Sequence, residues 1–220
     1  NYLLFYICEL TLISGLVALI FSTIVVMNML NGIFFLKNRF ELRMGVGACL
    51  GLMGVGLVFW PEITDFETGR ETLMAVALAV LATFLASVGN IASARNQRHG
   101  IPVIEANTYG MTYGALIMLT LALVTGQEFS FEMTSSYIGS LLFLTVFATI
   151  IAFLSYLTLL GRVGVERGAY ASLIFPLVAL GISTIVEGYQ WSAYAGIGIA
   201  LILTGNFLIL KRGSRVFPTM

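Results

Sequence analysis

Residues 10–43 read LTLISGLVALIFSTIVVMNMLNGIFFLKNRFELR, a long uncharged run that ends in a cluster of bases. A helix needs about 20 apolar residues to cross the ~30 Å hydrocarbon core of a bilayer. The run is long enough to do so, and Lys37, Arg39 and Arg43 mark its end. This stretch therefore predicts a transmembrane helix that leaves the membrane at a basic loop.

The same arrangement repeats along the whole chain of 220 residues. Seven uncharged stretches follow one another, at residues 10–36, 44–61, 72–94, 106–127, 133–161, 168–186 and 188–210. Hydrophobic residues make up 59% of the chain and charged residues only 10%, against about 25% in soluble domains. We expect an all-α, polytopic transmembrane helical bundle, because helices satisfy their own backbone hydrogen bonds in lipid.

The bases occur only in every second connection, apart from Arg70. They form four groups: Lys37, Arg39 and Arg43; Arg95 and Arg98; Arg162 and Arg167; and Lys211, Arg212 and Arg215. The positive-inside rule makes this side cytoplasmic. We therefore predict a multi-pass protein of a plasma membrane with a cytoplasmic C-terminus. The net charge is zero, which does not favour a nucleic-acid partner.

Residues that could carry catalysis or bind a metal are scarce. The chain has one histidine, His99, in a predicted cytoplasmic turn, and neither a zinc-protease motif nor a phosphate-binding loop. Its two cysteines, Cys8 and Cys49, lie in separate apolar runs and are interpreted as structural. We expect no enzyme activity, no catalytic residue, no metal and no cofactor. The rival interpretation is a receptor-like scaffold, or a membrane enzyme whose reactive residues lie in spans outside this chain.

A repeat becomes visible when the chain is shifted against itself by 151 residues. Gly47 then aligns with Gly198 and Gly54 with Gly205, and the ends of the apolar runs also match. The repeat unit holds five spans, so equivalent helices cross the membrane in opposite directions, as in many secondary transporters. The apolar residues 1–8 are too short to span, and we interpret them as the end of a helix that starts upstream.

The chain combines five-plus-five inverted spans with SGLVALIFS at residues 14–22, followed by a Gly-x6-Gly at 47–54, and with AYASLIFP at 169–176, followed by a Gly-x6-Gly at 198–205. In this combination the sequence resembles the EamA family of the drug/metabolite transporter (DMT) superfamily. Asn38 and Val25 depart from the family pattern, at positions where an acid and a proline are common.

This resemblance implies ten inverted spans when intact, of which the chain holds seven complete spans and part of an eighth. Residues 1–61 would be the remainder of the first EamA repeat (the end of span 3, and spans 4 and 5), and residues 72–212 the complete second repeat (spans 6–10). The implied function is alternating-access transport of a small metabolite, an amino acid or related compound, with export across the bacterial inner membrane. The implied cavity is walled by spans 3, 4, 6, 8 and 9.

Uncharged polar residues at helical spacing within these spans are the candidates for lining the cavity, together with one acid and one mid-helix proline. They are Glu9, Ser22, Asn28, Asn31, Thr83, Ser87, Asn90, Thr149, Tyr156, Ser172 and Pro176. Asparagine is costly to leave unpaired in lipid, so Asn28 and Asn31 either line the cavity or bond neighbouring helices. Serine and threonine often bond their own helix instead.

The expected partners are a small-molecule substrate and the lipid bilayer. Proton coupling stays open, with Glu9 as the one carboxylate available for it at the outer end of a span. A homodimer stays open as well.

Overall fold

The computed structural model describes residues 1–12, 14–38, 40–60, 69–127, 130–169, 171, 174, 178 and 192–210. Every regular element among these residues is a helix, and no strand occurs in them. Within the described residues, four helical stretches are long and apolar enough to cross a membrane: Leu16–Leu36, Arg70–Arg98, Val103–Val124 and Ser135–Val163. The prediction of an all-α chain with membrane-spanning helices is confirmed to this extent.

The chain divides into two compact units, and each is described by itself. The first comprises Asn1–Ile91 with Val165–Met220, and the second comprises Ala92–Gly164. Helix α6 (Arg70–Arg98) runs from the first unit into the second without a break.

The first unit also contains α1 (Tyr2–Glu9), α2 (Ser14–Ser22), α3 (Ile24–Leu36), α4 (Leu42–Val58), α10 (Val165–Ala169) and α12 (Ala193–Leu210). Helices α2 and α3 form the span expected from the opening stretch, interrupted only at Thr23. The Thr23 hydroxyl donates a hydrogen bond to the carbonyl of Ile20 at 2.6 Å. Such bonding to the preceding turn often bends a helix, which accounts for the break.

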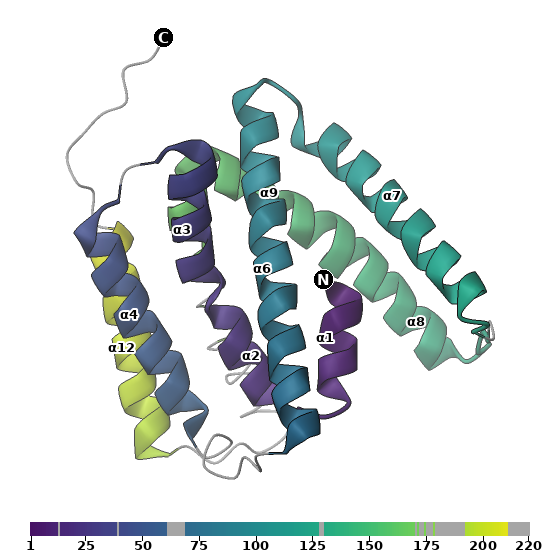
Figure 1. Ribbon diagram of the computed structural model, residues 1–220, viewed down its shortest axis with the longest axis horizontal. Helices are drawn as coiled ribbons and strands as arrows, with labels where there is room; N and C mark the ends of the chain where they lie inside the picture. Colours follow the sequence, from purple (N-terminus) through teal and green to yellow (C-terminus); the bar gives the residue numbers. More distant parts are fainter. Residues whose placement is uncertain are drawn as a thin grey trace. The chain divides into compact units, whose positions relative to one another are not determined.

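Helices α4 and α12 are the most closely paired elements of the first unit and lie side by side in Figure 1. A Cβ atom on Gly54 would lie 2.5 Å from the carbonyl oxygen of Gly198, and one on Gly205 would lie 2.6 Å from that of Gly47. The two helices therefore run antiparallel, and their backbones touch where glycine leaves room.

Apolar side chains surround this helix pair and the neighbouring α1 and α2. One buried cluster joins α3, α4 and α12 through residues such as Val25, Val55 and Ile202. A second joins α1, α2 and α6 through residues such as Cys8, Val17 and Ala79. The first cluster thus packs against α3 and the second against α6, the two helices that carry the buried polar residues described below.

The second unit consists of the end of α6, helix α7 (Val103–Val124) and a long rod built from α8 (Ser135–Phe143), η1 (Leu144–Ile151) and α9 (Ala152–Val163). The rod is continuous in Figure 1, but its middle segment η1 is a π-helix. Gly100, with a φ of 79°, allows the chain to turn between α6 and α7.

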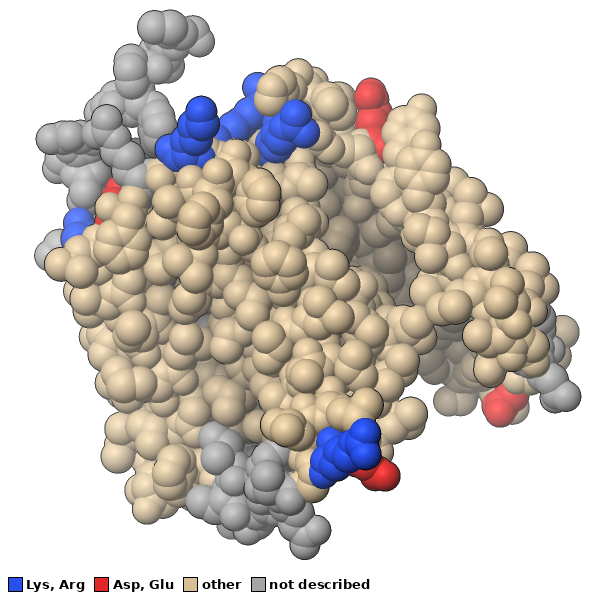
Figure 2. All heavy atoms as spheres, viewed as in Figure 1, with Lys and Arg blue, Asp and Glu red and all other residues tan. Residues whose placement is uncertain are grey.

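Helices α7, α8 and η1 bury none of their side chains, although most of these are apolar. The charges of α6 lie in its first and last turns, at Arg70 and Glu71 and at Arg95 and Arg98. Figure 2 accordingly shows a broad surface without charged side chains along the helices. This distribution is typical of helices that face hydrocarbon.

Candidate functional site

The most polar interior region of the first unit lies between α3 and α6. Helix α3 contributes Asn28 and Asn31, three residues apart, and α6 contributes Thr83, Ser87 and Asn90 on one face. All five are buried, with exposed fractions between 0% and 7%. We call these five residues the polar seam. The structure thus brings together five of the predicted site residues from two helices.

Two hydrogen bonds cross the polar seam. The Asn31 amide nitrogen Nδ2 donates to the Ser87 hydroxyl at 2.8 Å. The Asn90 Nδ2 donates to the Asn28 Oδ1 at 3.5 Å, which is near the limit for such a bond. The seam is therefore held by one good and one stretched hydrogen bond.

Asn28 keeps an unused hydrogen-bond donor. Its Oδ1 accepts from Asn90, but its Nδ2 has no partner among the described residues, and the residue is 0% exposed. Leaving a buried donor unpaired costs about 1–3 kcal/mol. Buried polar groups are otherwise nearly always bonded, so this nitrogen requires an explanation.

Two predicted site residues, Thr83 in the polar seam and Ser22 outside it, use their hydroxyl groups within their own helices. Ser22 donates to the carbonyl of Ala18 and Thr83 to that of Ala79, each at 2.8 Å. This is the common way in which serine and threonine are satisfied in membrane helices. Both residues are buried, yet their donors are already occupied.

The remaining predicted residues lie outside the polar seam. Glu9 is the exposed last residue of α1. Thr149 and Tyr156 belong to the second unit: Thr149 is exposed in η1 and donates to the carbonyl of Leu144 at 2.9 Å, and Tyr156 is half-buried in α9. Ser172 and Pro176 lie outside the described residues.

Sequence reasoning missed two polar residues, Asn206, which is buried, and Gln97, which is half-buried and bonds a second helix. Asn206 in α12 is 6% exposed, and neither its Nδ2 nor its Oδ1 has a partner among the described residues. The sequence did contain a signal for Asn206, an amide within an apolar run, and the same signal identified Asn28 as a candidate. Gln97 in α6 donates from Nε2 to the carbonyl of Leu157 in α9 at 2.9 Å. No sequence signal connects residues 60 positions apart.

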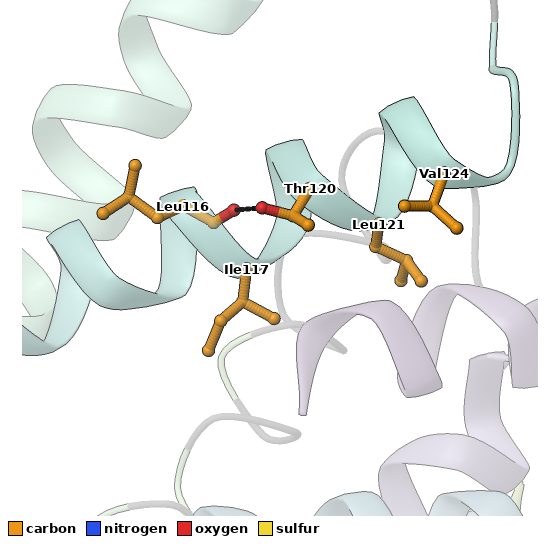
Figure 3. Close-up of a pocket in the computed structure, with 5 residues that line it drawn as sticks. All are labelled: Leu116, Ile117, Thr120, Leu121 and Val124. Carbon is orange, nitrogen blue, oxygen red and sulfur yellow. Dashed lines mark hydrogen bonds between the residues drawn. The ribbon is translucent and has the colours of Figure 1, made fainter.

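A shallow apolar pocket of about 420 Å³ lies on α7. Figure 3 shows its lining by Leu116, Ile117, Thr120, Leu121 and Val124, all from one helix. The only hydroxyl, that of Thr120, donates to the carbonyl of Leu116 at 2.8 Å. The lining of this pocket therefore offers no spare hydroxyl donor to a solute.

Ionisable residues do not gather within the described part of the chain. No three His, Cys, Asp or Glu side chains there lie close enough to hold a metal ion. The buried polar residues among those described are all serine, threonine or asparagine, so the polar seam carries no charge.

Comparison with known proteins assigns the chain to a family. The sequence model of the EamA-like transporter family matches residues 73–211, which is more than half of the chain. The chain belongs to the EamA family. The recognised resemblance to the DMT superfamily is thereby confirmed. With its apolar helices, this EamA chain is a multi-pass membrane protein.

Several curated bacterial proteins are similar to this EamA chain. An "Uncharacterized transporter" of Clostridium kluyveri is 23% identical over 87% of the chain and 61% of its own length. "Protein PagO" of Salmonella typhimurium is 24% identical over 90% and 64%. A "Probable amino-acid metabolite efflux pump" of Escherichia coli is 25% identical over 89% and 67%. The chain thus spans about two thirds of the length of these relatives.

A solved crystal structure shares the fold. It superposes with a TM-score of 0.77 over 94% of this chain and 71% of its own, at 18% sequence identity. At this identity the likeness concerns the fold alone.

Proposed function

We propose that the full-length protein is a secondary transporter of the bacterial inner membrane that exports a small polar or amphipathic metabolite by alternating access. The observation that carries the proposal is the polar seam of α3 and α6. Five uncharged polar side chains are costly within membrane helices unless they serve packing or line a solute path. The family name and the transporter names of the relatives point the same way.

The glycine contacts between α4 and α12 support two inverted halves. The 151-residue shift relates Gly47 to Gly198 and Gly54 to Gly205. A two-fold axis between such halves turns a contact of Gly54 with Gly198 into a contact of Gly205 with Gly47. Both contacts occur. We therefore propose that residues 1–61 belong to the first repeat and residues 72–212 to the second, in a ten-span protein.

The basic residues of the first unit support a cytoplasmic C-terminus. Arg43, from the first basic connection, donates from Nη2 to the carbonyl of Leu208 near the end of α12 at 2.9 Å. Arg167, from a later basic connection, lies 3.8 Å from the carboxylate of Glu41. Two basic connections and the end of α12 therefore gather at one end of the unit, which we assign to the cytoplasm.

The uncharged seam suits a neutral or zwitterionic solute. The name of the E. coli relative suggests an amino acid or one of its derivatives, and export rather than uptake. Coupling to protons would have to use a carboxylate near the path, and Glu9 is our candidate for it.

Efflux from cells that overproduce the full-length protein tests the proposal. Untargeted mass spectrometry of the medium would compare the native protein, empty cells and an Asn28→Leu/Asn31→Leu variant matched for membrane abundance. We expect a few solutes to be enriched outside by the native protein alone. Enrichment by neither protein would favour the scaffold or enzyme interpretation. Equal enrichment by both would keep transport and make the asparagines packing residues.

A further inference from the structure

The hydrogen-bonding capacity of the polar seam is already used at nearly every residue. The Thr83 hydroxyl bonds its own helix, and the Asn31 amide is bonded to Ser87. The Asn28 amide differs because its oxygen is engaged and its nitrogen is unpaired among the described residues. Among the described residues, Asn28 is therefore the member of the seam whose buried donor has no partner.

The free group can only donate. An amide nitrogen has two hydrogens and no acceptor capacity, so a ligand at this position must present a lone pair. Oxygen acceptors of metabolites fall into two classes. They are either charged, as in carboxylates and phosphates, or uncharged, as in amide, ester and ketone carbonyls and hydroxyls.

The surroundings of Asn28 select between these two classes. None of the buried polar residues among those described is ionisable, so a charged oxygen would have no buried cation beside it. Lys37 follows nine residues later, about 13 Å further along the helix axis. A carboxylate without a cation is strongly disfavoured in a membrane interior, whereas an uncharged oxygen needs only the hydrogen bond.

We propose that the Asn28 Nδ2 donates a hydrogen bond to an uncharged acceptor oxygen of the transported solute. The assignment rests on the proposed transport function and adds the class of group that is recognised at this position. A zwitterionic amino acid would then place an uncharged side-chain oxygen here, and its carboxylate elsewhere. A fixed water molecule has the same acceptor chemistry, and the experiment separates the two.

Three amino acids of similar size provide the probes. Cells overproducing the full-length protein would be loaded with the dipeptides L-alanyl-L-glutamine, L-alanyl-L-leucine and L-alanyl-L-glutamate, and the liberated glutamine, leucine and glutamate measured in the medium. These three solutes share the charged α-amino and α-carboxylate groups. The side chain of glutamine has an uncharged oxygen, that of leucine has no oxygen, and that of glutamate has charged oxygens. An untargeted survey of the same medium would record every other solute that the protein enriches.

Asn28→Leu and Asn28→Ser are the test variants, and Thr204→Val in α12, outside the polar seam, is the control. Serine cannot overfill the site, and its hydroxyl would bond the preceding turn as those of Ser22 and Thr83 do. The Thr204 hydroxyl already donates to the carbonyl of Ala200 at 2.7 Å, so valine there removes an occupied hydroxyl at nearly constant volume. We expect glutamine export to fall about tenfold in both Asn28 variants, the effect of one lost hydrogen bond, and to stay within about twofold for Thr204→Val.

The outcomes separate the two proposals. If the native protein enriches no solute at all, the proposed function fails and this inference fails with it. If it enriches solutes equally with either Asn28 variant, or only solutes whose oxygens are all carboxylate oxygens, transport stands and this inference is overturned. If the Asn28 variants reduce the export of glutamine, leucine and glutamate by the same factor, a fixed water is the ligand and the inference is likewise overturned.

Discussion

Two helix interfaces of the first unit are built in opposite ways. Helices α4 and α12 meet through glycine, with backbone against backbone and no side chain between Gly54 and Gly198. Helices α3 and α6 meet through the polar seam, where long amide side chains reach across. A glycine contact has no rotamer to change, whereas an amide can exchange one hydrogen-bond partner for another.

This difference suggests that one interface of the unit stays fixed while the other moves. Close backbone contact depends on van der Waals packing, which is lost as soon as the helices separate. The α4–α12 pair is therefore suited to be a fixed axis. The polar seam is joined by one short and one stretched hydrogen bond and keeps one unpaired donor, so its amides can exchange partners when the helices part. We infer that movement of the unit takes place at the seam.

The largest effect is expected from Gly54→Ala. The new methyl group would lie 2.5 Å from a backbone oxygen that cannot turn away, so the helices must separate. We expect a loss of about 1–3 kcal/mol of stability, and strongly reduced membrane abundance. Thermal unfolding followed by size-exclusion chromatography of the detergent-solubilised protein measures this loss.

Gly56→Ala is the matched control because it lies in the same helix and its Cβ would meet nothing within 4 Å. It should leave stability unchanged or raise it by up to about 1 kcal/mol through helix propensity. Equal stability of the two variants would show that the α4–α12 contact is not a tight axis.

A smaller effect is expected from removing the hydrogen bond between Asn31 and Ser87 in the polar seam. Ser87→Ala leaves the buried Asn31 amide without its partner and should cost about 1–2 kcal/mol. Adding Asn31→Leu should cost little more, because the unpaired amide is then gone. A double-mutant cycle in SDS-induced unfolding measures the coupling, and strictly additive losses would mean that the pair does not stabilise the seam.

In the second unit, the last turn of α6 contacts α9 through the Gln97 amide, and this contact can be tested in the same way. The Gln97 amide lies where a Cβ on Gly161 would be, so Gly161→Ala should push it away from the carbonyl of Leu157. We expect Gly161→Ala and Gln97→Leu each to cost about 1 kcal/mol in the same unfolding assay. The double variant should cost no more than either single change, and two independent losses would argue against this contact.

The smallest effect on stability is expected from removing the ion pair of Glu41 and Arg167. The charged groups are 3.8 Å apart, and the two side chains are 49% and 35% exposed, so water and salt screen them. Glu41→Gln should change stability by at most about 0.5 kcal/mol, and the change should vanish in 1 M salt. A loss above about 1.5 kcal/mol that persists in salt would make this ion pair a third strong contact of the unit.

Much of the helical framework was predictable. Apolar runs place α6, α7 and α12 within a few residues of their observed bounds. Helix α6 extends to Arg98, one turn beyond the predicted end at residue 94, because its polar last turn can leave the hydrocarbon and stay helical. The π-helix η1 had no signal, since hydropathy does not distinguish hydrogen bonding to the fifth residue from bonding to the fourth.

The sequence predicted which residues of the candidate site share a helix face, but it did not predict their hydrogen-bond partners. Helical spacing grouped Asn28 with Asn31, and Thr83 with Ser87 and Asn90. It did not show which hydroxyl would bond its own helix and which would bond an amide across the seam. That choice depends on the distance and rotation between α3 and α6, which the neighbouring apolar clusters determine.

The sequence by itself determined the helical class, the membrane-spanning character and the EamA resemblance. These properties follow from the transfer of single segments into lipid and from residues close together in the chain. Only the tertiary structure decided that Asn31 bonds Ser87, 56 residues away, and that the Asn28 nitrogen has no described partner. Hydrogen bonds require atoms within about 3 Å, and only packing brings distant segments that close.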